Sequence, residues 1–323
     1  MDGSQAPVLE VRGLSTSFVT DEGVFRAVDD LSFELRRGEF MGLVGESGCG
    51  KTTAMLSMLR LLPGAGRITA GQVLLDGVDL MQLSEAEMRA VRWSKISLIF
   101  QGAMNALNPV RTVGDQIAEA ILIHDESLTS KDVEPRVGEL LELVGIGAER
   151  GGQYPHQYSG GMRQRAMIAM ALACGPEVVI ADEPTTALDV MIQAQILELL
   201  ERLQRELGLA VILVTHDLSV VAEICHKVLV MYGGVAAEYA LVDTIFNQPL
   251  HPYTQLLLEA FPDVSRPEDR LISIPGQPPR LNALPPGCRF APRCPMVIER
   301  CQVEAPRLRQ VHPGHWATCH RIE

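Results

Sequence analysis

The most informative stretch of this 323-residue chain reads Gly45-Glu46-Ser47-Gly48-Cys49-Gly50-Lys51-Thr52. It fits the pattern G-x-x-x-x-G-K-[ST], in which glycines let backbone N–H groups turn inward around phosphate oxygens. An apolar stretch, residues 40–45, precedes the loop, and a helical pattern over residues 51–62 follows it. The positive end of that helix would add to the attraction for an anion. Strand, glycine-rich loop and helix together predict a site for nucleotide phosphates.

The side chains of this loop have separate expected roles. Lys51 can reach the β- and γ-phosphates of a nucleotide, and the Thr52 hydroxyl can bind Mg²⁺. A chance glycine-rich turn is the alternative, and the strand and helix on either side argue against it. The residues expected to contact the nucleotide are Gly45, Glu46, Ser47, Gly48, Cys49, Gly50, Lys51, Thr52 and Thr53.

An acidic motif lies far downstream of the loop. The apolar residues 178–181 read as a strand that ends in Asp182 and Glu183. Asp182 suits a water-mediated hold on Mg²⁺, and Glu183 then lies where it can polarise an attacking water. Two acids after a strand are weak evidence alone because strand ends often carry solvated charges. Combined with the glycine-rich loop, they predict hydrolysis of a nucleoside triphosphate.

The order of the expected elements indicates an α/β fold. Helices expected at 113–123, 133–144, 160–173, 190–206 and 218–224 alternate with strands expected at 40–45, 96–100, 178–181, 210–215 and 227–231. This alternation predicts a parallel sheet covered by helices, with a helical insertion over about residues 102–175. We expect one domain over residues 1–248. Residues 249–323 form a smaller extension in which regular structure is not expected, because it contains Pro275, Pro278, Pro279, Pro285, Pro286, Pro292 and Pro295.

The charge balance restricts the classes of partner. Lys and Arg total 28 against 40 Asp and Glu, which gives a net charge of −12. Such an acidic chain lacks the basic footprint of a protein that binds nucleic-acid backbones. The apolar runs are far shorter than the roughly 20 residues of a membrane span, and residues 1–10 do not resemble a secretory signal. We expect a cytosolic protein that only another chain can hold at a membrane.

The resemblance to a known family begins with Tyr158-Ser159-Gly160-Gly161-Met162-Arg163-Gln164, which is similar to the signature L-S-G-G-Q of ABC ATPases. The resemblance implies their fold: a parallel core sheet, an antiparallel β subdomain and a helical subdomain. It also implies that Ser159, Gly160 and Gly161 bind the γ-phosphate held by a partner subunit, so that two chains sandwich two ATP molecules. Tyr158 and Met162 depart from the usual leucine and glutamine, and Met162 would lose one polar contact near the partner's nucleotide.

Further motifs of the family follow in order along the chain. Gln101 resembles the Q-loop glutamine that senses Mg²⁺ and the γ-phosphate, and Ala187-Leu188-Asp189 resembles the D-loop at the dimer interface. His216 resembles the switch histidine that contacts the γ-phosphate. Phe18 is the expected stacking partner of adenine, and Phe25 is the alternative. The resemblance thus implies a catalytic set of Lys51, Glu183 and His216 and a Mg²⁺ site of Thr52, Gln101 and Asp182.

The extension carries a more specific resemblance. His251-Pro252-Tyr253-Thr254, Ile274-Pro275-Gly276 and Pro285-Pro286-Gly287-Cys288 look like the tail of dipeptide/oligopeptide permease ATPases, and this likeness covers essentially the whole chain. It implies ATP-driven import of peptides, with nickel, opines or oligosaccharides as alternative cargoes. It also implies two membrane-spanning permease subunits, a second ABC ATPase subunit and an extracytoplasmic solute-binding protein as partners. The chain would then lie peripherally on the cytoplasmic face of the inner membrane.

A competing hypothesis is a soluble ABC ATPase that acts on DNA, RNA or ribosomes. Such proteins use coiled-coil insertions, duplicated ABC domains or basic arms, and the sequence contains none of these. Its net charge of −12 also opposes this interpretation. We therefore expect no nucleic-acid partner. In a transport ATPase, residues 102–109 would lie where a membrane subunit docks; an ordinary loop that leads into a helix is the alternative.

Four cysteines crowd the extension with the spacing C-x5-C-x6-C-x17-C: Cys288, Cys294, Cys301 and Cys319. In a reducing cytosol such a group is more often a metal site than a pair of disulfides. Structural zinc usually shows short C-x2–4-C hooks, which are missing here, whereas four thiolates on longer loops can hold an iron–sulfur cubane. The family resemblance implies a [4Fe-4S] cluster at these positions. Zinc and unmetallated thiols are the alternatives.

Overall fold

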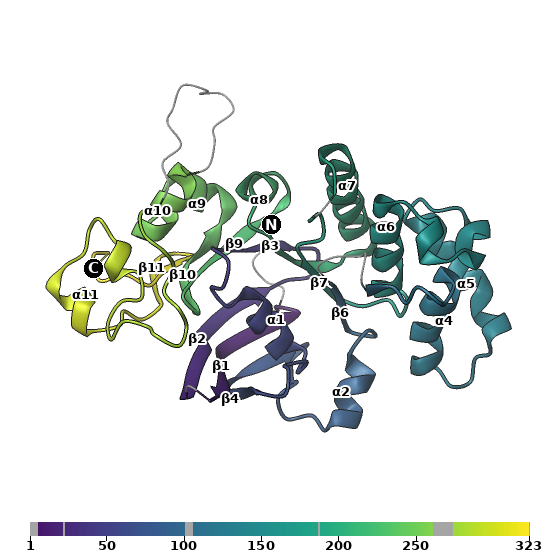
Figure 1. The fold of residues 1–323 in the computed structure, drawn as a ribbon, viewed down its shortest axis with the longest axis horizontal. Coiled ribbons are helices and arrows are strands. Elements are labelled where there is room, and N and C mark those ends of the chain that lie inside the picture. Colours follow the sequence, from purple (N-terminus) through teal and green to yellow (C-terminus); the bar gives the residue numbers. More distant parts are fainter. Residues whose placement is uncertain (1–5, 22, 101–105, 187, 261–273, 323) are drawn as a thin grey trace. The chain divides into compact units, whose positions relative to one another are not determined.

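The computed structural model describes residues 6–21, 23–100, 106–186, 188–260 and 274–322 (Figure 1). Contacts divide the chain into two compact units. Unit 1 comprises Met1–Val8, Arg36–Glu39 and Gln82–Val214, and unit 2 comprises Leu9–Leu35, Phe40–Met81 and Thr215–Glu323. The glycine-rich loop and the cysteine-rich extension both belong to unit 2. The acidic pair and the signature belong to unit 1, and the expected boundary near residue 248 stays a prediction.

Unit 2 contains an antiparallel sheet of four strands in the order β2-β1-β4-β5. Its strands are β1 (Leu9–Thr20), β2 (Gly23–Leu35), β4 (Gly66–Leu75) and β5 (Val78–Asp79). Buried Leu31, Phe33 and Leu35 alternate along β2 with more exposed residues, because successive side chains of a strand point to opposite faces. Helix α1 (Lys51–Met58) packs on this sheet, where the buried hydroxyls of Thr16 and Ser57 are 2.7 Å apart.

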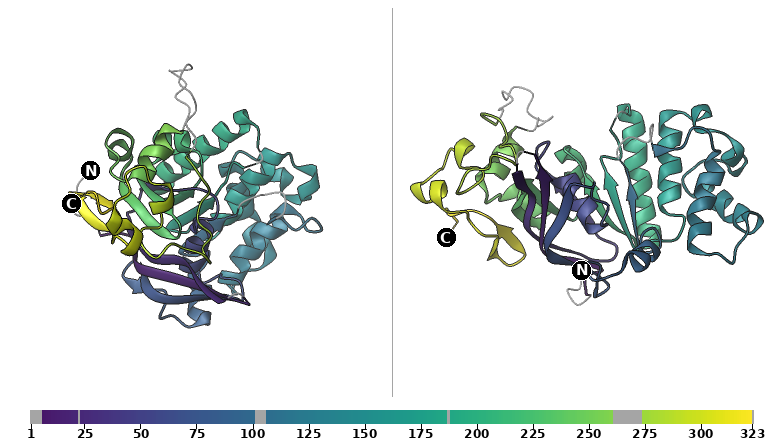
Figure 2. Two further views of the ribbon diagram at one scale, coloured as in Figure 1. Left: turned by 60° about the vertical axis from the view of Figure 1, so that its left-hand side comes forward. Right: turned by 60° about the horizontal axis from the view of Figure 1, so that its bottom comes forward.

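Unit 2 also contains five strands in the order β11-β12-β10-β9-β3. They are β3 (Phe40–Val44), β9 (Lys227–Tyr232), β10 (Val235–Leu241), β11 (Arg309–His312) and β12 (His315–Ala317). Strand β3, which leads into the glycine-rich loop, pairs in parallel with β9. Strand β12 comes from the end of the chain and pairs with β10, so the extension adds strands to the same sheet (Figure 2).

The extension is less irregular than its prolines suggested. It contains α10 (Pro252–Glu259), η3 (Ala291–Arg293), α11 (Glu299–Val303), β11 and β12, while α8 (Leu218–Ile224) and α9 (Val242–Asn247) precede it. Of the described residues in the proline-rich stretch 274–295, only the short η3 turn is regular. The expectation was therefore right for that stretch and wrong for its flanks. Prolines occur in the flanks too, but Pro252 stands at the first position of α10, where a helix tolerates proline.

The extension shares its hydrophobic core with the strand that carries the glycine-rich loop. One cluster of buried side chains joins β3, α8, β9, β10 and α9 to Tyr253 and Phe290 of the extension. Tyr253 is completely buried, and its ring centroid lies 4.5 Å from that of Tyr232 and 5.4 Å from that of Phe290. Burying such aromatic side chains stabilises a fold by about 2 kcal/mol each. The extension and the loop strand therefore stabilise each other.

Unit 1 contains three parallel strands in the order β8-β7-β6. They are β6 (Ile96–Ile99), β7 (Val178–Asp182) and β8 (Ala210–Val214), and every residue of β7 and β8 is buried. Continuous burial is typical of a parallel sheet with both faces covered. The chain between β6 and β7 contains α4 (Val113–His124), α5 (Ser130–Leu143), η1 (Ala148–Gly152), η2 (Pro155–Gln157) and α6 (Gly160–Ala171). The expected strands of unit 1 are thus confirmed, and helices lie between β6 and β7, while the bounds of the helical insertion stay a prediction.

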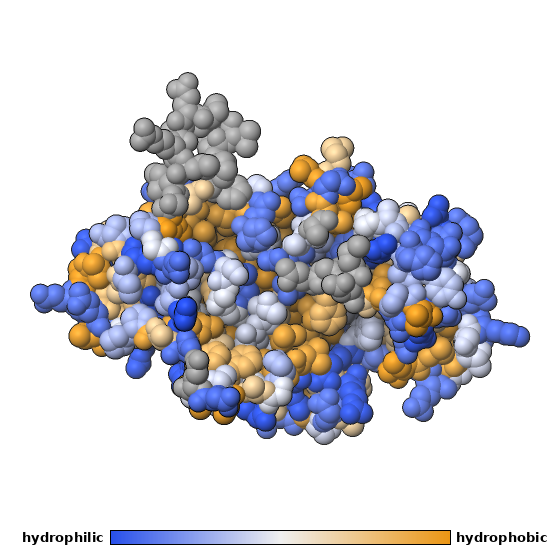
Figure 3. Space-filling model, in the orientation of Figure 1, coloured by the Kyte–Doolittle hydropathy of each residue, from blue (hydrophilic) through white to orange (hydrophobic). Residues whose placement is uncertain are grey.

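The remaining helices of unit 1 are α2 (Glu85–Val91) and α7 (Val190–Leu207). None of the helices in the described ranges is both long and apolar enough to cross a bilayer. On the face drawn in Figure 3, hydrophobic residues form several separate groups among hydrophilic ones. Two of the most exposed hydrophobic side chains, Val190 and Met191, begin α7, with 79% and 72% of their surface accessible.

Candidate functional site

The glycine-rich loop is a tight turn that only glycine can make at two of its positions. Gly45 and Gly50 have φ angles of 146° and 105°, which L side chains rarely adopt. A Cβ atom on Gly45 would lie 2.2 Å from the Met231 carbonyl oxygen, and one on Gly50 would lie 2.5 Å from that of Ala27. The loop therefore packs its backbone against β9 and β2. This close packing explains why the motif demands glycines there.

Lys51 lies inside the loop that precedes it. Its ammonium donates hydrogen bonds to the carbonyl oxygens of Gly45, at 2.6 Å, and Glu46, at 3.2 Å, and the residue is buried. Burial raises the pKa of neighbouring Cys49, so this cysteine is a neutral thiol at neutral pH. The ammonium is the charged side chain that the loop encloses. The loop thus combines one buried cation with the beginning of α1.

Glu46, the second loop residue, is bound by the extension rather than by solvent. Its carboxylate accepts two hydrogen bonds from Arg293, at 2.6 and 3.0 Å, in the bidentate geometry that favours arginine. Its backbone N–H donates to the Tyr253 hydroxyl at 3.0 Å. The carboxylate raises the pKa of Arg293, which also donates to the Tyr232 hydroxyl at 3.2 Å. The sequence predicted Glu46 as a loop residue but gave no sign of Arg293 as its partner.

The two candidate aromatic residues are neighbours on adjacent strands. Phe18 of β1 pairs with Phe25 of β2, and their rings stack with centroids 5.6 Å apart and planes 18° apart. Phe25 lines a cavity of about 490 Å³ together with Ser47 and Gly48 of the loop. Phe18 does not line this cavity. The geometry of unit 2 therefore places Phe25 beside the loop.

The acidic pair in unit 1 ends a buried strand. Asp182 is the last residue of β7 and is buried. Glu183 has a φ of 43°, in the left-handed region where a residue other than glycine carries backbone strain of about 1 kcal/mol. Its N–H donates to the Val214 carbonyl at 2.8 Å, and its carboxylate accepts from the Thr186 hydroxyl at 3.0 Å. These contacts hold the carboxylate at the end of the sheet strands of unit 1.

The signature residues begin a helix, as the sequence predicted. Ser159 is the N-cap of α6 and accepts a hydrogen bond from the N–H of Met162 at 3.3 Å. A Cβ atom on Gly161 would lie 2.8 Å from Ile192 of α7, so glycine allows the two helices to approach. Asp189 caps α7 in the same manner by accepting from the N–H of Ile192 at 3.0 Å. Two helix N-termini therefore open near each other in unit 1.

The departures from the usual signature have local explanations. The ring of Tyr158 is buried, and its hydroxyl donates to the Arg150 carbonyl at 3.0 Å, so the larger side chain is fully accommodated. The Met162 sulfur lies 3.9 Å from a guanidinium nitrogen of Arg150. In unit 2, His216 is exposed and precedes Asp217, which caps α8. Gln101 and Ala187 lie outside the described residues.

Comparisons with known proteins agree with this set of motifs. Residues 28–186 match the family described as ABC transporter, and residues 237–301 match the one described as oligopeptide/dipeptide transporter, C-terminal region. The chain is 50% identical over 318 residues to the probable peptide ABC transporter ATP-binding protein y4tR of Sinorhizobium fredii, covering 97% of this chain and 95% of that one. This chain belongs to the ATP-binding subunits of peptide-type ABC transporters.

Other relatives and solved structures support the same membership. The dipeptide transport ATP-binding protein DppD of Escherichia coli is 46% identical over 315 residues, which cover 97% of this chain and 96% of that one. The dimeric structure of the ATP-binding cassette MJ0796 bound to ADP and Pi has a TM-score of 0.64 and 27% identity. It covers 72% of this chain and 98% of that one. The fold is thus that of an ABC ATPase, and the chain is an ATPase.

The four extension cysteines of this ABC subunit form a loose group. Burial raises the pKa of each of Cys288, Cys294 and Cys319, and for Cys288 it reaches about 11; neighbouring cysteines contribute in the same direction. The N–H of Cys288 donates to the Cys301 carbonyl at 2.7 Å, and the Arg321 N–H donates to the Cys319 sulfur at 3.4 Å. In the described ranges, however, no three His, Cys, Asp or Glu side chains are arranged to hold a metal ion.

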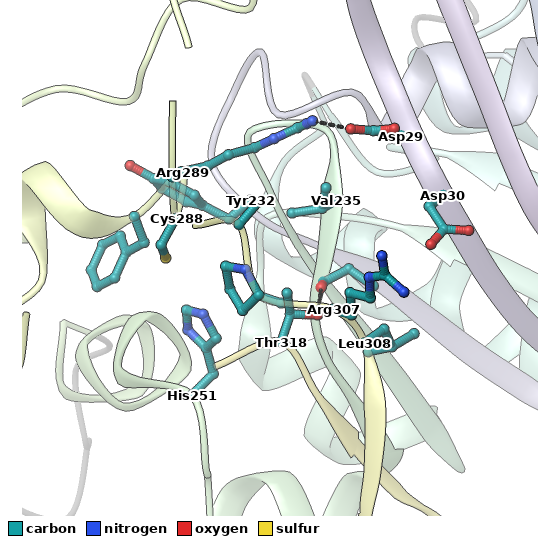
Figure 4. A pocket seen from close by; sticks show the side chains of 16 residues that line it. Asp29, Asp30, Tyr232, Val235, His251, Cys288, Arg289, Arg307, Leu308 and Thr318 are labelled. Atoms are coloured by element: carbon teal, nitrogen blue, oxygen red, sulfur yellow. Dashed lines mark hydrogen bonds and ion pairs between the residues drawn. The ribbon is translucent and has the colours of Figure 1, made fainter. Parts of the chain in front are cut away.

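A cavity of about 340 Å³ lies beside this group within unit 2 (Figure 4). Cys288 and His251 face it from one side, and the ion pair of Arg289 with Asp29 bounds it on the other. Burial lowers the pKa of His251 to about 4, so this histidine is neutral at physiological pH. Arg289 also donates to the Gly233 carbonyl. The cavity is therefore polar at both ends and adjoins β10.

Proposed function

We propose that this ATPase drives an importer of dipeptides or oligopeptides. The observation that carries the proposal is the buried Lys51 ammonium inside a glycine-rich loop at the start of α1, in a chain 50% identical to a probable peptide ABC transporter ATP-binding protein. The names of the relatives favour a peptide cargo, and nickel, opines and oligosaccharides are the alternatives. A net charge of −12 disfavours a soluble ABC ATPase that acts on nucleic acid.

The proposed catalytic roles follow from the chemistry of each side chain. Lys51 and the loop amides bind the β- and γ-phosphates, and Glu183 orients and polarises the attacking water. His216 contacts the γ-phosphate. The hard oxygens of Thr52 and Asp182 suit Mg²⁺, which would neutralise phosphate charge; Gln101 remains a predicted third ligand. Because Phe25 lines the cavity beside Ser47 and Gly48, we assign adenine stacking to Phe25 rather than Phe18.

The proposed working unit contains two ATPase chains. Ser159, Gly160 and Gly161 would bind the γ-phosphate held by the mate, and Asp189 would lie at the interface. Val190 and Met191 directly after Asp189 are two adjacent exposed hydrophobic residues, and contact with the mate would remove their apolar surface from water. We propose a second, related ABC subunit as the mate. Two permease subunits and a solute-binding protein would complete the assembly on the cytoplasmic face of the inner membrane.

We further propose that the four extension cysteines hold a [4Fe-4S] cluster. The proposal rests on the family resemblance, on the proximity of the four cysteines in one part of the extension, and on the N–H···S bond to Cys319. Protein purified without oxygen should then contain about four irons per chain. Stoichiometric zinc, or metal-free thiols, would contradict this part of the proposal alone.

The importer role is tested in vesicles that contain the complete complex. ATP hydrolysis should rise when solute-binding protein loaded with dipeptide is added, and labelled dipeptide should accumulate on the opposite side. Nickel, an opine and an oligosaccharide serve as competing cargoes. Accumulation of one of these without accumulation of peptide would overturn the peptide assignment and leave the transport ATPase intact. Hydrolysis that responds to none of them would overturn the importer role.

A further inference from the structure

The extension reaches the glycine-rich loop and lines the cavity next to it. The cavity of about 490 Å³ is bounded by Phe25, Ser47 and Gly48 on one side and by residues 277–282 of the extension on the other. All of these residues belong to unit 2. A volume of this size lies within the range of small-molecule sites. An aromatic ring and a phosphate-binding loop on the same cavity suit a nucleotide, whose base and phosphates need those two surfaces.

The segment 277–282 is anchored by the same residue that binds the loop. Arg293 donates from Nε to the Pro275 carbonyl at 2.7 Å, while its two other nitrogens hold the Glu46 carboxylate. Pro279 lies against Gly233, and the Ala283 N–H closes a turn onto the Arg280 carbonyl at 2.8 Å. One buried guanidinium therefore ties the glycine-rich loop to the start of the cavity wall. Arg293 thus connects residues 274–275, which directly precede the wall, to the loop.

Arg280 is the charged residue of this wall. Its side chain is exposed at the cavity, and within the described residues no carboxylate forms an ion pair with it. An arginine that faces a phosphate-binding loop adds positive charge where a triphosphate is strongly negative. We propose that residues 277–282 form part of the ATP pocket and that Arg280 binds the nucleotide phosphates. This inference rests on the proposed ATP site and extends it to the extension.

The test measures nucleotide affinity of the full chain by titration calorimetry. Arg280→Ala should weaken ATP and ADP binding about tenfold, since a charge-assisted contact to phosphate is lost. Arg280→Lys should recover part of the affinity because it retains the charge. Adenosine, which has no phosphate, should bind both variants as it binds the wild type. Arg307→Ala, which removes an exposed arginine from the other cavity of the extension, is the matched control and should bind ATP normally.

Three results would overturn the proposal. One is ATP binding by Arg280→Ala with the affinity of the wild type. Another is an equal loss of adenosine binding, which would place the contact on the base. A third is an equal loss of ATP affinity in Arg307→Ala, which would show that the effect comes from the change in net charge and not from a contact with phosphate. Lys51→Ala distinguishes failure of the Arg280 proposal from failure of the nucleotide site. If Lys51→Ala binds ATP as tightly as the wild type, the proposed nucleotide site is wrong, whatever the result for Arg280→Ala.

Discussion

The two helix N-termini that we propose as anion sites, those of α1 and α6, differ in their construction. Helix α1 begins at Gly50, encloses the buried Lys51 ammonium and receives contacts from the extension through Glu46. Helix α6 follows the exposed N-cap Ser159, and the basic residue of its first turn, Arg163, donates to the Pro155 carbonyl at 2.8 Å. The start of α1 takes its cation and its contact with the extension from its own chain. The start of α6 carries an exposed N-cap serine, and in the proposed dimer it would meet the nucleotide that the other chain holds.

The contrast suggests that substitutions can affect nucleotide binding and ATP turnover separately in this ATPase. A site with its own cation needs no partner to attract a triphosphate, whereas an exposed helix end with one hydroxyl gains only about 1 kcal/mol from its dipole. In the proposed dimer, the start of α6 of one chain would meet a nucleotide that is already bound at the glycine-rich loop of the other chain. Variants at the two ends should therefore affect different steps.

The largest expected effect comes from Glu183→Gln, which keeps both helix ends and removes the proposed base. Steady ATP turnover by the assembled complex should fall by a factor of 10² to 10⁴ because general-base catalysis is lost. ATP binding should remain, and the two ATPase chains should stay associated in ATP, as measured by light scattering. Asp217→Asn, at the cap of α8, is the control. Near-normal turnover in the Glu183 variant would show that another group activates water.

The second largest expected effect comes from a substitution at the start of α6, which should reduce ATP turnover without changing ATP binding by the isolated chain. Ser159→Glu places a carboxylate at the start of α6, where it suits the helix but repels the mate's γ-phosphate. ATP binding by the isolated chain should be unchanged, while turnover of the complex should fall roughly tenfold or more. Thr129→Glu, at the cap of α5, gives the same charge change elsewhere on unit 1. If both variants reduce turnover equally, the start of α6 has no special role.

A third variant tests how much the contact between the extension and the glycine-rich loop contributes to stability. Arg293→Ala leaves the Glu46 carboxylate without its bidentate partner, and the Arg293 side chain is only 5% exposed. Removing one partner from such a pair should cost about 2 kcal/mol of unfolding free energy after allowance for the exposure of Glu46. Chemical denaturation measures this loss. Restoring most of it with Arg293→Ala/Glu46→Gln would show that the unpaired carboxylate is its cause.

The last prediction concerns the pH dependence of stability and the buried core that contains His251. Burial lowers the pKa of His251 to about 4 in the folded protein, below its usual 6.5. Between these values the unfolded chain binds more protons, so stability should fall as the pH drops from 6.5 to 4, by about 1 kcal/mol per pH unit. His251→Asn keeps an acceptor for the Tyr253 N–H but does not titrate. The unfolding free energy of this variant should depend less steeply on pH than that of the wild type. Identical slopes for the two proteins would show that His251 is not the titrating group.

Sequence reasoning performed best where the decisive contacts are local. The glycines at 45 and 50, the start of α6 at Ser159 and the span of α4 follow from spacing and from what each residue type permits over a few positions. The same reasoning also found the four cysteines, although their ligand remains a proposal. Motif order along one chain was enough to predict the family and the fold.

What the sequence could not supply was long-range pairing. Arg293 and Glu46 are 247 residues apart, and nothing in either local pattern marks the other as its partner. The pairing of β12 with β10 and the position of Phe25 beside Ser47 are equally invisible in a linear chain. The first two of these contacts depend on how the extension folds back, on the glycine-rich loop and on β10 respectively. The choice between Phe18 and Phe25 therefore needed the cavity itself.

The strand β12 also has a consequence for biosynthesis. Glu238 in β10 is completely buried, and its carboxylate accepts from the N–H groups of Leu250 and His251 and lies 2.6 Å from Nε2 of His315 in β12. Until residues 315–317 have been synthesised, β10 lacks that neighbour and the buried acid lacks one of its partners. The edge of this sheet at β10 can therefore form only after β12 has been made, whereas the glycine-rich loop on β3 of the same sheet is made much earlier.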